Sequence, residues 1–181
     1  DQADFIKKAI ATVRDALYQG AILSALMLLY YLRDRRSTFI ICTSIPISVI
    51  ATFALMFFRN LITPQAPISI NVMTLSGLAL GIGMLVDNAI VVIENIFTKR
   101  EKKMDPKEAA ITGTEEVFIA ITASTLTSVV VFLPIVFVTE EVKMLYSGLA
   151  LTVTFSLVAS LLVAITLVPS LAAKSPGDVK K

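Results

Sequence analysis

The sequence predicts an all-α fold, a polytopic membrane helix bundle with five transmembrane helices. Of its 181 residues, 56% are hydrophobic and 17% are charged, and the mean hydropathy is +0.81, which lies outside the range of soluble globular domains. Five apolar stretches are close to the length of about 20 residues that a helix needs to cross a bilayer. The strict alternation of apolar and polar residues that a membrane β-strand requires is absent from the sequence.

The elements follow from these apolar stretches and from the polar segments between them. Residues 1–15 place their apolar side chains on one side of a helix, which predicts an amphipathic, extracytoplasmic lead-in helix. The transmembrane bundle is expected over residues 16–173 and a cytoplasmic tail over 174–181. Its spans are predicted at about 16–32, 39–58, 70–97, 117–138 and 144–169.

A short cytoplasmic surface helix is predicted over residues 105–116, between the third and fourth spans. Asp105, Pro106 and Glu108 have the spacing of an N-cap, a proline at the first helical position and an acid three residues after the cap. The alternative for this segment is a solvated connector without a further role, which the charged composition favours. Either interpretation gives the fourth span a polar approach from the cytoplasm.

The distribution of basic residues predicts the orientation in the membrane. Eleven of the sixteen Lys and Arg residues lie after the first, third and fifth spans, and only five lie at the alternate positions. The positive-inside rule therefore places the N-terminus outside and the C-terminus in the cytoplasm. Because a chain that begins outside shows no signal-peptide pattern here, we expect it to be part of a longer protein.

The composition also excludes several classes of function. With no His and a single Cys, the chain has no Cys/His zinc site, Ser-His-Asp triad or Cys-His pair. We therefore expect no enzyme activity and no bound metal. A net charge of +2, with the basic residues confined to short junctions, predicts no nucleic-acid partner. The expected surroundings are the lipid bilayer.

Asp87, near the middle of the third span, is the residue that most requires a functional explanation. A carboxylate near mid-membrane costs about 2.5–3.5 kcal/mol on insertion scales, which Leu or Ala would avoid. Proton or cation binding is the favoured role, and a structural hydrogen bond to a neighbouring Ser or Thr is the alternative. An intramembrane aspartyl protease is excluded, because it needs a second aspartate on a facing helix, whereas Glu94 lies on the same helix.

Helical periodicity divides the third span into two neighbouring faces. One stripe contains Ser76, Leu80, Gly83, Asp87 and Glu94. A second stripe, about 100° further round, contains Gly77, Gly81, Asn88 and Asn95. Small residues allow close approach of another helix, so Gly77, Gly81 and Gly83 are predicted packing positions. We expect copies of the chain to self-associate through the face of Gly77 and Gly81.

Three further residues are assigned subordinate roles around Asp87. Asn88 cannot carry a proton and can only tune its neighbour. Glu94 lies near the helix end, where a structural or interfacial role is favoured over proton transfer. Thr125, one of several hydroxyl residues of the fourth span, is a possible group for hydrating Asp87, although packing or bonding to its own helix is more common for such residues.

The run GLALGIGMLVDNAIVVIENI, from Gly77 to Ile96, strongly resembles the fourth transmembrane helix of resistance-nodulation-division transporters, above all of the hydrophobe/amphiphile efflux branch. The resemblance covers nearly the whole chain. Ser69 to Asn71 is similar to the start of that helix, Asp105 to Val117 to the cytoplasmic helix after it, and Thr122 to Val138 to the fifth helix. The five predicted spans then correspond to the second to sixth of twelve.

The resemblance implies proton-driven multidrug export through the inner membrane of a prokaryote, with protons as the coupling ion and no other cofactor. Asp87 matches the first acid of the family's usual Asp-Asp pair, and a lysine from the other half of the transporter completes that relay. Asn88 departs from the pair and leaves one acid. The implied partners are the other half, the extracytoplasmic porter domains and further subunits of a trimer.

Two alternatives stay open at this point. The metal-exporting branch of the same superfamily shares the fold, although the methionines of this chain show no pairing at helical spacing. A non-transporting membrane accessory or assembly subunit would use Asp87 only to hold helices together.

Overall fold

The computed structural model describes residues 35–64, 68–132, 134–135 and 139–174, together with eight isolated residues before them. Four helices lie in this part of the chain: α2, Arg35–Ile62; α3, Val72–Glu101; α4, Pro106–Val130; and α5, Glu140–Lys174. Within these ranges the long regular elements are all helices and no residue is in a strand, which confirms the all-α prediction. The predicted lead-in helix, the first span and residues 175–181 of the tail lie outside the described residues, apart from the isolated positions.

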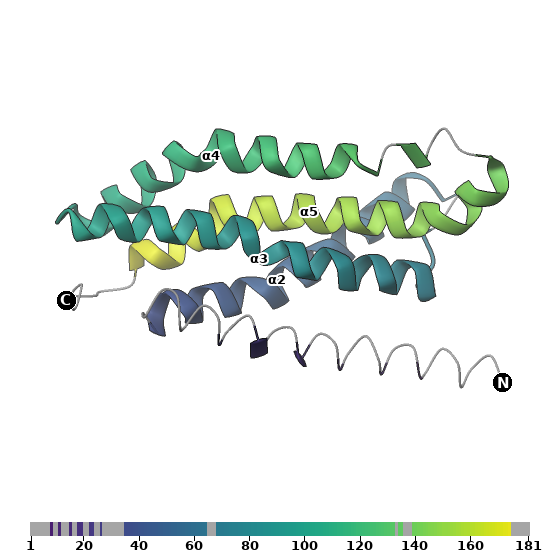
Figure 1. Ribbon diagram of the computed structural model, residues 1–181, viewed down its shortest axis with the longest axis horizontal. Helices are drawn as coiled ribbons and strands as arrows, with labels where there is room; N and C mark the ends of the chain where they lie inside the picture. The colour runs from purple at the N-terminus through teal and green to yellow at the C-terminus, as the bar shows by residue number, and fades with distance from the viewer. Residues whose placement is uncertain are drawn as a thin grey trace.

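Helices α3 and α5 form the central pair of the bundle (Figure 1). They run in the same direction, because Gly77 of α3 lies against Leu149 and, one turn later, Gly81 lies against Ser156. Helix α2 packs on this pair from one side and α4 from the other, and over the described residues α2 and α4 do not contact each other. Helix α5, the fifth predicted span, is therefore the helix most enclosed by the other described helices, and α3 comes next.

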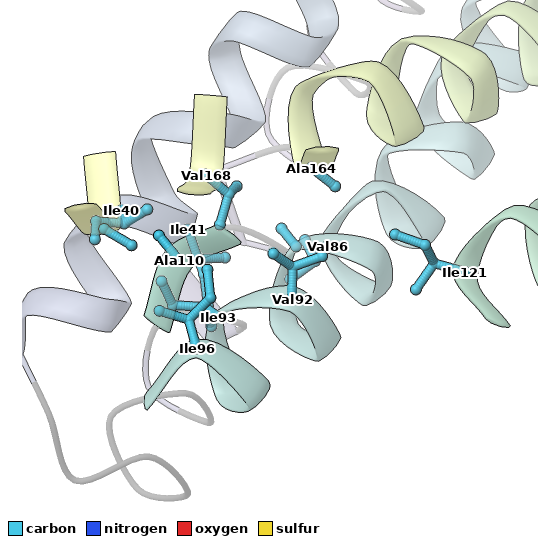
Figure 2. Close-up of a cluster of buried hydrophobic side chains, with 12 residues drawn as sticks. Ile40, Ile41, Val86, Val92, Ile93, Ile96, Ala110, Ile121, Ala164 and Val168 are labelled. Carbon is cyan, nitrogen blue, oxygen red and sulfur yellow. The ribbon is translucent and has the colours of Figure 1, made fainter. Parts of the chain in front are cut away.

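The hydrophobic core gathers where α2 begins and α3 ends. Figure 2 shows Ile93 and Ile96 of α3 grouped with Ile41 of α2 and Val168 of α5, and Val92 of α3 belongs to the same core cluster. All five side chains are fully buried. Since lipid tails are as apolar as these side chains, close packing and hydrogen bonds, rather than transfer out of water, hold such helices together.

Local hydrogen bonds set where α3 and α4 begin. Asn71 caps α3 in a capping box, its side chain accepting from the Thr74 amide at 2.9 Å while its own amide donates to the Thr74 hydroxyl at 2.7 Å. Asp105 caps α4, and Pro106 is its first residue. The start at Asp105 is the one that its spacing to Pro106 and Glu108 predicts, whereas the capping role of Asn71 was not predicted.

The connections at the two ends of α3 are also tied down. Before α3, the Asn60 side chain accepts from the Ile68 amide at 2.8 Å and donates to the Ile68 carbonyl at 3.0 Å. After α3, the amides of Lys103 and Met104 donate back to the carbonyls of Arg100 and Lys99, which is a Schellman motif. Lys103 has a φ of 64° there, the left-handed conformation that this motif requires.

The structure departs from the predicted spans in one place. We expected a surface helix over 105–116 and a separate span over 117–138, but α4 is one continuous helix that ends at Val130. Residues 114–130 contain no Pro or Gly, so no helix-breaking residue lies at the expected boundary between residues 116 and 117. Pro134 follows shortly after its end, as expected for a residue that cannot continue a helix.

Three of the described helices are long and apolar enough to cross a membrane: Ser37–Ile62, Val72–Glu101 and Tyr146–Lys174. They contain most of the predicted second, third and fifth spans and extend beyond them toward the C-terminus of each helix. Five spans were predicted, and three are found among the described helices. The predicted first span lies outside the described residues, and the predicted fourth span forms one helix with the predicted surface helix. The architecture is a membrane helix bundle.

Candidate functional site

Asp87 lies on a face of α3 that no described helix covers. Every member of its predicted stripe is exposed, namely Ser76, Leu80, Gly83, Asp87 and Glu94. Among the residues that the structure describes, the Asp87 side chain has no hydrogen bond or ion pair. The alternative role, a structural hydrogen bond to a neighbouring Ser or Thr, therefore finds no support in α2, α4 or α5.

The second stripe of α3 faces the bundle interior. Asn88 is 8% exposed and donates from Nδ2 to the hydroxyl oxygen of Thr125 at 3.0 Å, and Thr125 on α4 is 6% exposed. A buried amide and a buried hydroxyl thus satisfy each other across two helices, as polar groups inside a membrane protein must. The structure brings together two of the predicted site residues, Asn88 and Thr125, and leaves Asp87 on the adjoining open face.

The glycines of α3 divide in the same way. A Cβ atom at Gly77 would lie 2.7 Å from the Leu149 carbonyl oxygen, and one at Gly81 would lie 2.5 Å from the Cβ of Ser156. Helix α5 of the same chain therefore occupies the face through which we expected self-association, and that expectation is wrong. At Gly83 a Cβ would meet nothing within 4 Å, so this glycine takes no part in the α5 contact and lies one turn before Asp87 on the open face.

Beyond Asp87, the last turns of α3 are fastened to α4 by a group that we call the α3–α4 clamp, formed by Asn95, Lys99, Gly113 and Glu116. Asn95 Nδ2 donates to the Gly113 carbonyl at 2.7 Å and to Glu116 Oε2 at 3.2 Å, and the Lys99 ammonium pairs with Glu116 Oε1. The hydrogen bond from Lys99, followed by that from Asn95, lowers the pKa of Glu116. Glu94, although next to Asn95, points to the exposed side and takes no part in the clamp.

The burial of Arg100 is not predicted by the sequence, in which this residue is one of several basic residues at the end of the third span. In the structure Arg100 is 6% exposed and donates from Nη2 to the carbonyl oxygen of Ala172 at 2.7 Å. Its guanidinium carbon lies 5.6 Å from the centre of the Phe97 ring, within the range of a cation–π contact. The spacing of an aromatic residue three positions before an arginine on one helix was the available signal.

The partner face of α5 was also missed. Small residues recur there at every fourth position, and this surface receives α3: Gly148, Thr152, Ser156, Ser160 and Ala164. The spacing of small residues at i and i+4 was present in the sequence and is typical of closely packed membrane helices. Over the described residues, no group of three or more His, Cys, Asp or Glu side chains is placed to hold a metal ion.

Comparison with known proteins identifies a matching family and several relatives. The family model described as the AcrB/AcrD/AcrF family matches residues 1–175. The swarming motility protein SwrC of Bacillus subtilis is 38% identical over 175 residues, covering 95% of this chain and 16% of that protein. The multidrug resistance protein MdtC of Pectobacterium atrosepticum is 33% identical over 181 residues, covering 100% of this chain and 17% of that protein.

Among solved structures, the chain is similar to the crystal structure of a heavy metal efflux pump. The TM-score is 0.75 at 29% sequence identity, and the match covers 93% of this chain and 16% of the pump. The chain thus spans about a sixth of the length of these relatives. The acid on an apolar helix and the helical bundle are consistent with the family model that matches nearly the full chain. The chain therefore belongs to the AcrB/AcrD/AcrF family of resistance-nodulation-division transporters.

Proposed function

We propose that this chain is the transmembrane, proton-translocating part of a proton-driven efflux pump for drugs and other hydrophobic compounds, with Asp87 as the proton carrier. The observation that carries the proposal is the position of Asp87, which lies on an apolar helix, on an uncovered face and without a partner among the described residues. The two protonation states of a carboxyl group in such a place differ greatly in their free energy within a membrane. The protonated group is neutral, whereas the ionised group needs a cation or water beside it.

The open face of α3 gives room for the group that balances the ionised state. Gly83, exposed and one turn before Asp87, allows the backbone of another helix to come close beside the acid. The family resemblance supports a lysine from the other half of the transporter as that cation. Loss of the ion pair on protonation then gives two arrangements of α3 against its neighbour, which is the kind of switch that alternating transport needs.

Asn88 takes the second position of the family's usual Asp-Asp pair, so Asp87 is the one acid of that pair in this chain. Its amide is held by Thr125 on α4 and has no accessible protonated form that could carry charge. We infer that Asn88 fixes the rotation of α3 and so holds Asp87 on the open face.

The surroundings of the chain are part of the same proposal. The chain covers only 16% and 17% of two relatives, which supports a larger protein. The second transmembrane half and the extracytoplasmic porter domains of that protein rest on the family resemblance. The asymmetry of Lys and Arg supports an inner-membrane orientation with the N-terminal side of this chain outside. Assembly as a trimer rests on the family alone.

Metal-cation export is the second function, because the chain also resembles the structure of a heavy metal efflux pump. Asp87 would serve proton coupling in either pump, so the two functions differ in the exported compound. Cells that carry the whole protein would be compared for their resistance to hydrophobic dyes and to soft metal ions. Protection against dyes alone supports the drug-type pump, and protection against metal ions alone overturns it.

The role of Asp87 is tested in the whole protein with Asp87→Asn, which keeps the shape of the side chain and removes its charge and its proton. We expect energised dye efflux to fall to the level of cells without the pump, while the amount of protein in the membrane is unchanged. Glu94→Gln, on the same exposed face, is the matched control and should retain most activity. Normal efflux by Asp87→Asn would show that Asp87 is not the carrier and would favour a structural role for it.

A further inference from the structure

The Ser156 hydroxyl of α5 is a buried polar group that lies against the backbone of α3. Ser156 is fully buried, and among the described residues its Oγ atom has no hydrogen-bond partner. A Cβ atom built on Gly81 would lie 2.7 Å from this Oγ and 2.5 Å from the Ser156 Cβ. The hydroxyl oxygen is therefore in direct contact with α3, without room for a water between it and Gly81.

Ser156 differs from other hydroxyl residues of α5 in this respect. Thr152, Thr154, Thr166 and Ser170 each donate to the carbonyl four residues earlier on their own helix. This bond is the common way in which a helix satisfies a hydroxyl side chain. A buried hydroxyl without a partner lowers stability, and an alanine would avoid that loss at no cost in packing. Packing alone therefore does not explain a serine at this position.

The acceptors of α3 at this level are backbone carbonyls. The turn from Gly77 to Gly81 has the sequence GLALG, which contains no polar side chain. A backbone carbonyl has two lone pairs, and the hydrogen bond within the helix uses one of them. Because the glycines have no Cβ atom, α5 reaches the α3 backbone directly at Gly77 and Gly81. A change in the tilt of α3 is enough to exchange one backbone contact of the hydroxyl for another.

The two halves of α3 are held differently. The second half is fastened by the Asn88 bond to α4, by the α3–α4 clamp and by the bond from Arg100 to the Ala172 carbonyl of α5. The first half meets α5 through Gly77 and Gly81, where small side chains and backbone lie against each other. Small residues without interlocking side chains allow a helix to shift on its neighbour. The first half of α3 is therefore the half that can tilt.

Asp87 is placed to control such a tilt. It lies six residues after Gly81 and is the only charged residue of α3 before Glu94. The segments packed around α3, residues 37–58, 117–130 and 147–173, contain no Asp, Glu, Lys, Arg or Tyr, and their one titratable side chain is Cys42. A change of charge in this part of the bundle is thus a change at Asp87.

We propose that the first half of α3 has a second arrangement against α5, in which a backbone carbonyl of the turn Gly77–Gly81 accepts a hydrogen bond from the Ser156 hydroxyl. Neutral Asp87 favours this arrangement, because the ion pair that draws α3 toward another helix is then absent. Ser156 is a positioning residue, since it acts through the α3 backbone and Asp87 lies on the open face. The link to Asp87 rests on the proposed function, whereas the unbonded hydroxyl of the described arrangement does not.

The unbonded hydroxyl is tested by the stability of the whole protein purified in detergent. Ser156→Ala removes the hydroxyl and retains the Cβ atom. We expect the midpoint of thermal unfolding to rise, because a buried group without a partner is removed. Ser44→Ala is the matched control, since Ser44 is also buried but donates to the Ile41 carbonyl at 2.7 Å, and its midpoint should not rise. An unchanged or lower midpoint for Ser156→Ala would show that the hydroxyl already has a partner, and this overturns the proposal.

The second arrangement is tested by a double-mutant cycle with Asp87→Asn, which imitates the neutral acid. Changes at residues that share no contact are normally additive. We expect the shift of the midpoint caused by Ser156→Ala to be smaller or reversed in the Asp87→Asn protein, because the hydroxyl is bonded there. An equal or larger rise in that protein overturns the second arrangement.

Transport tests the positioning role with the same variants. We expect Ser156→Ala to slow proton-coupled efflux several-fold at an unchanged amount of protein in the membrane, and Ser44→Ala to leave efflux unchanged. Normal efflux by Ser156→Ala overturns the positioning role. If Ser156→Ala is not recovered from the membrane, Ser156→Gly takes its place in the cycle and in the efflux assay. Asp87→Asn alone is measured alongside, because its normal efflux would reject the proposed function separately.

Discussion

The guanidinium of Arg100 donates a hydrogen bond to the backbone carbonyl of Ala172, which joins the last turn of α3 to the last turns of α5. The final four carbonyls of a helix have no partner within the helix, and a cation there also matches the negative end of the helix dipole. Arg100 therefore caps α5 from a neighbouring helix. On its other side the clamp holds the same turn of α3 to α4, so α3, α4 and α5 are joined at one level.

Replacing Arg100 by Leu should destabilise the bundle by about 1.5–3 kcal/mol, the usual range for a hydrogen bond to a charged group. The change leaves the Ala172 carbonyl without its donor and removes the contact with the Phe97 ring. Thermal unfolding of the purified protein measures the effect. Lys102→Leu, two residues away and exposed, is the control. Equal unfolding midpoints for the two variants would show that Arg100 acts only as one more basic residue of the junction.

The described part of the fold was largely predictable, because apolar length and capping residues depend on local sequence. Asp105 begins its helix as expected, and the two faces of α3 follow from helical periodicity alone. The partners of those faces were not predictable in the same way. Which helix fills the space beside Gly81 is decided by the small residues of α5, such as Ser156, which lie far along the chain. The burial of Arg100 depends on where α5 ends.

The candidate site shows the same division. Asp87 was identified by the cost of an acid in an apolar helix, which is a property of its own sequence. The pairing of Asn88 with Thr125, by contrast, requires the register of α3 against α4, and helical periodicity does not provide it. Sequence reasoning named both residues, but the structure shows that they bond to each other and not to Asp87.

The clamp should make stability depend on pH. In the folded chain the pKa of Glu116 lies below its ordinary value of 4.5, because Lys99 and Asn95 bond to the carboxylate. A lowered folded-state pKa adds stability above the ordinary pKa, and this stability is lost as the pH falls through the lowered value. In Glu116→Gln, we expect a smaller loss of the unfolding midpoint between pH 7 and acid than in the unchanged protein. An identical acid loss in both proteins would show that the clamp contributes no pH dependence.

The orientation proposed from the basic residues can be measured with single cysteines. Thr63 follows α2 and Lys103 follows α3, and both are exposed at opposite ends of the bundle. In a Cys42→Ala background, we expect Thr63→Cys to react with an impermeant thiol reagent at the outer face of the membrane. Lys103→Cys should react only after the membrane is opened. The reverse pattern would invert the proposed topology, and equal labelling from outside would contradict the assignment of α3 as a single span.

Gly81 and Gly83 form a matched pair on α3, two residues apart and with opposite surroundings. At Gly81 a Cβ would lie 2.5 Å from the Cβ of Ser156, whereas at Gly83 it would meet nothing within 4 Å. Gly81→Ala should therefore separate α3 from α5 and destabilise the bundle by about 1–3 kcal/mol, as overpacking does. Gly83→Ala should have a neutral or favourable effect of up to about 1 kcal/mol on the bundle, because alanine is the better helix former.

The pair also distinguishes packing within the chain from packing on the open face. In Gly81→Ala, a second change of Ser156→Gly removes the opposing Cβ and should recover much of the lost unfolding midpoint, whereas Ser156→Gly should not help Gly83→Ala.

In the whole protein we expect a bulky side chain at Gly83 to affect transport. Gly83→Leu should reduce efflux while the protein level in the membrane is retained, because a helix that approaches Asp87 would be held away. Efflux unaffected by Gly83→Leu would mean that no helix comes close to α3 at this turn, and the cation that balances Asp87 would then have to arrive on a long side chain from a more distant backbone.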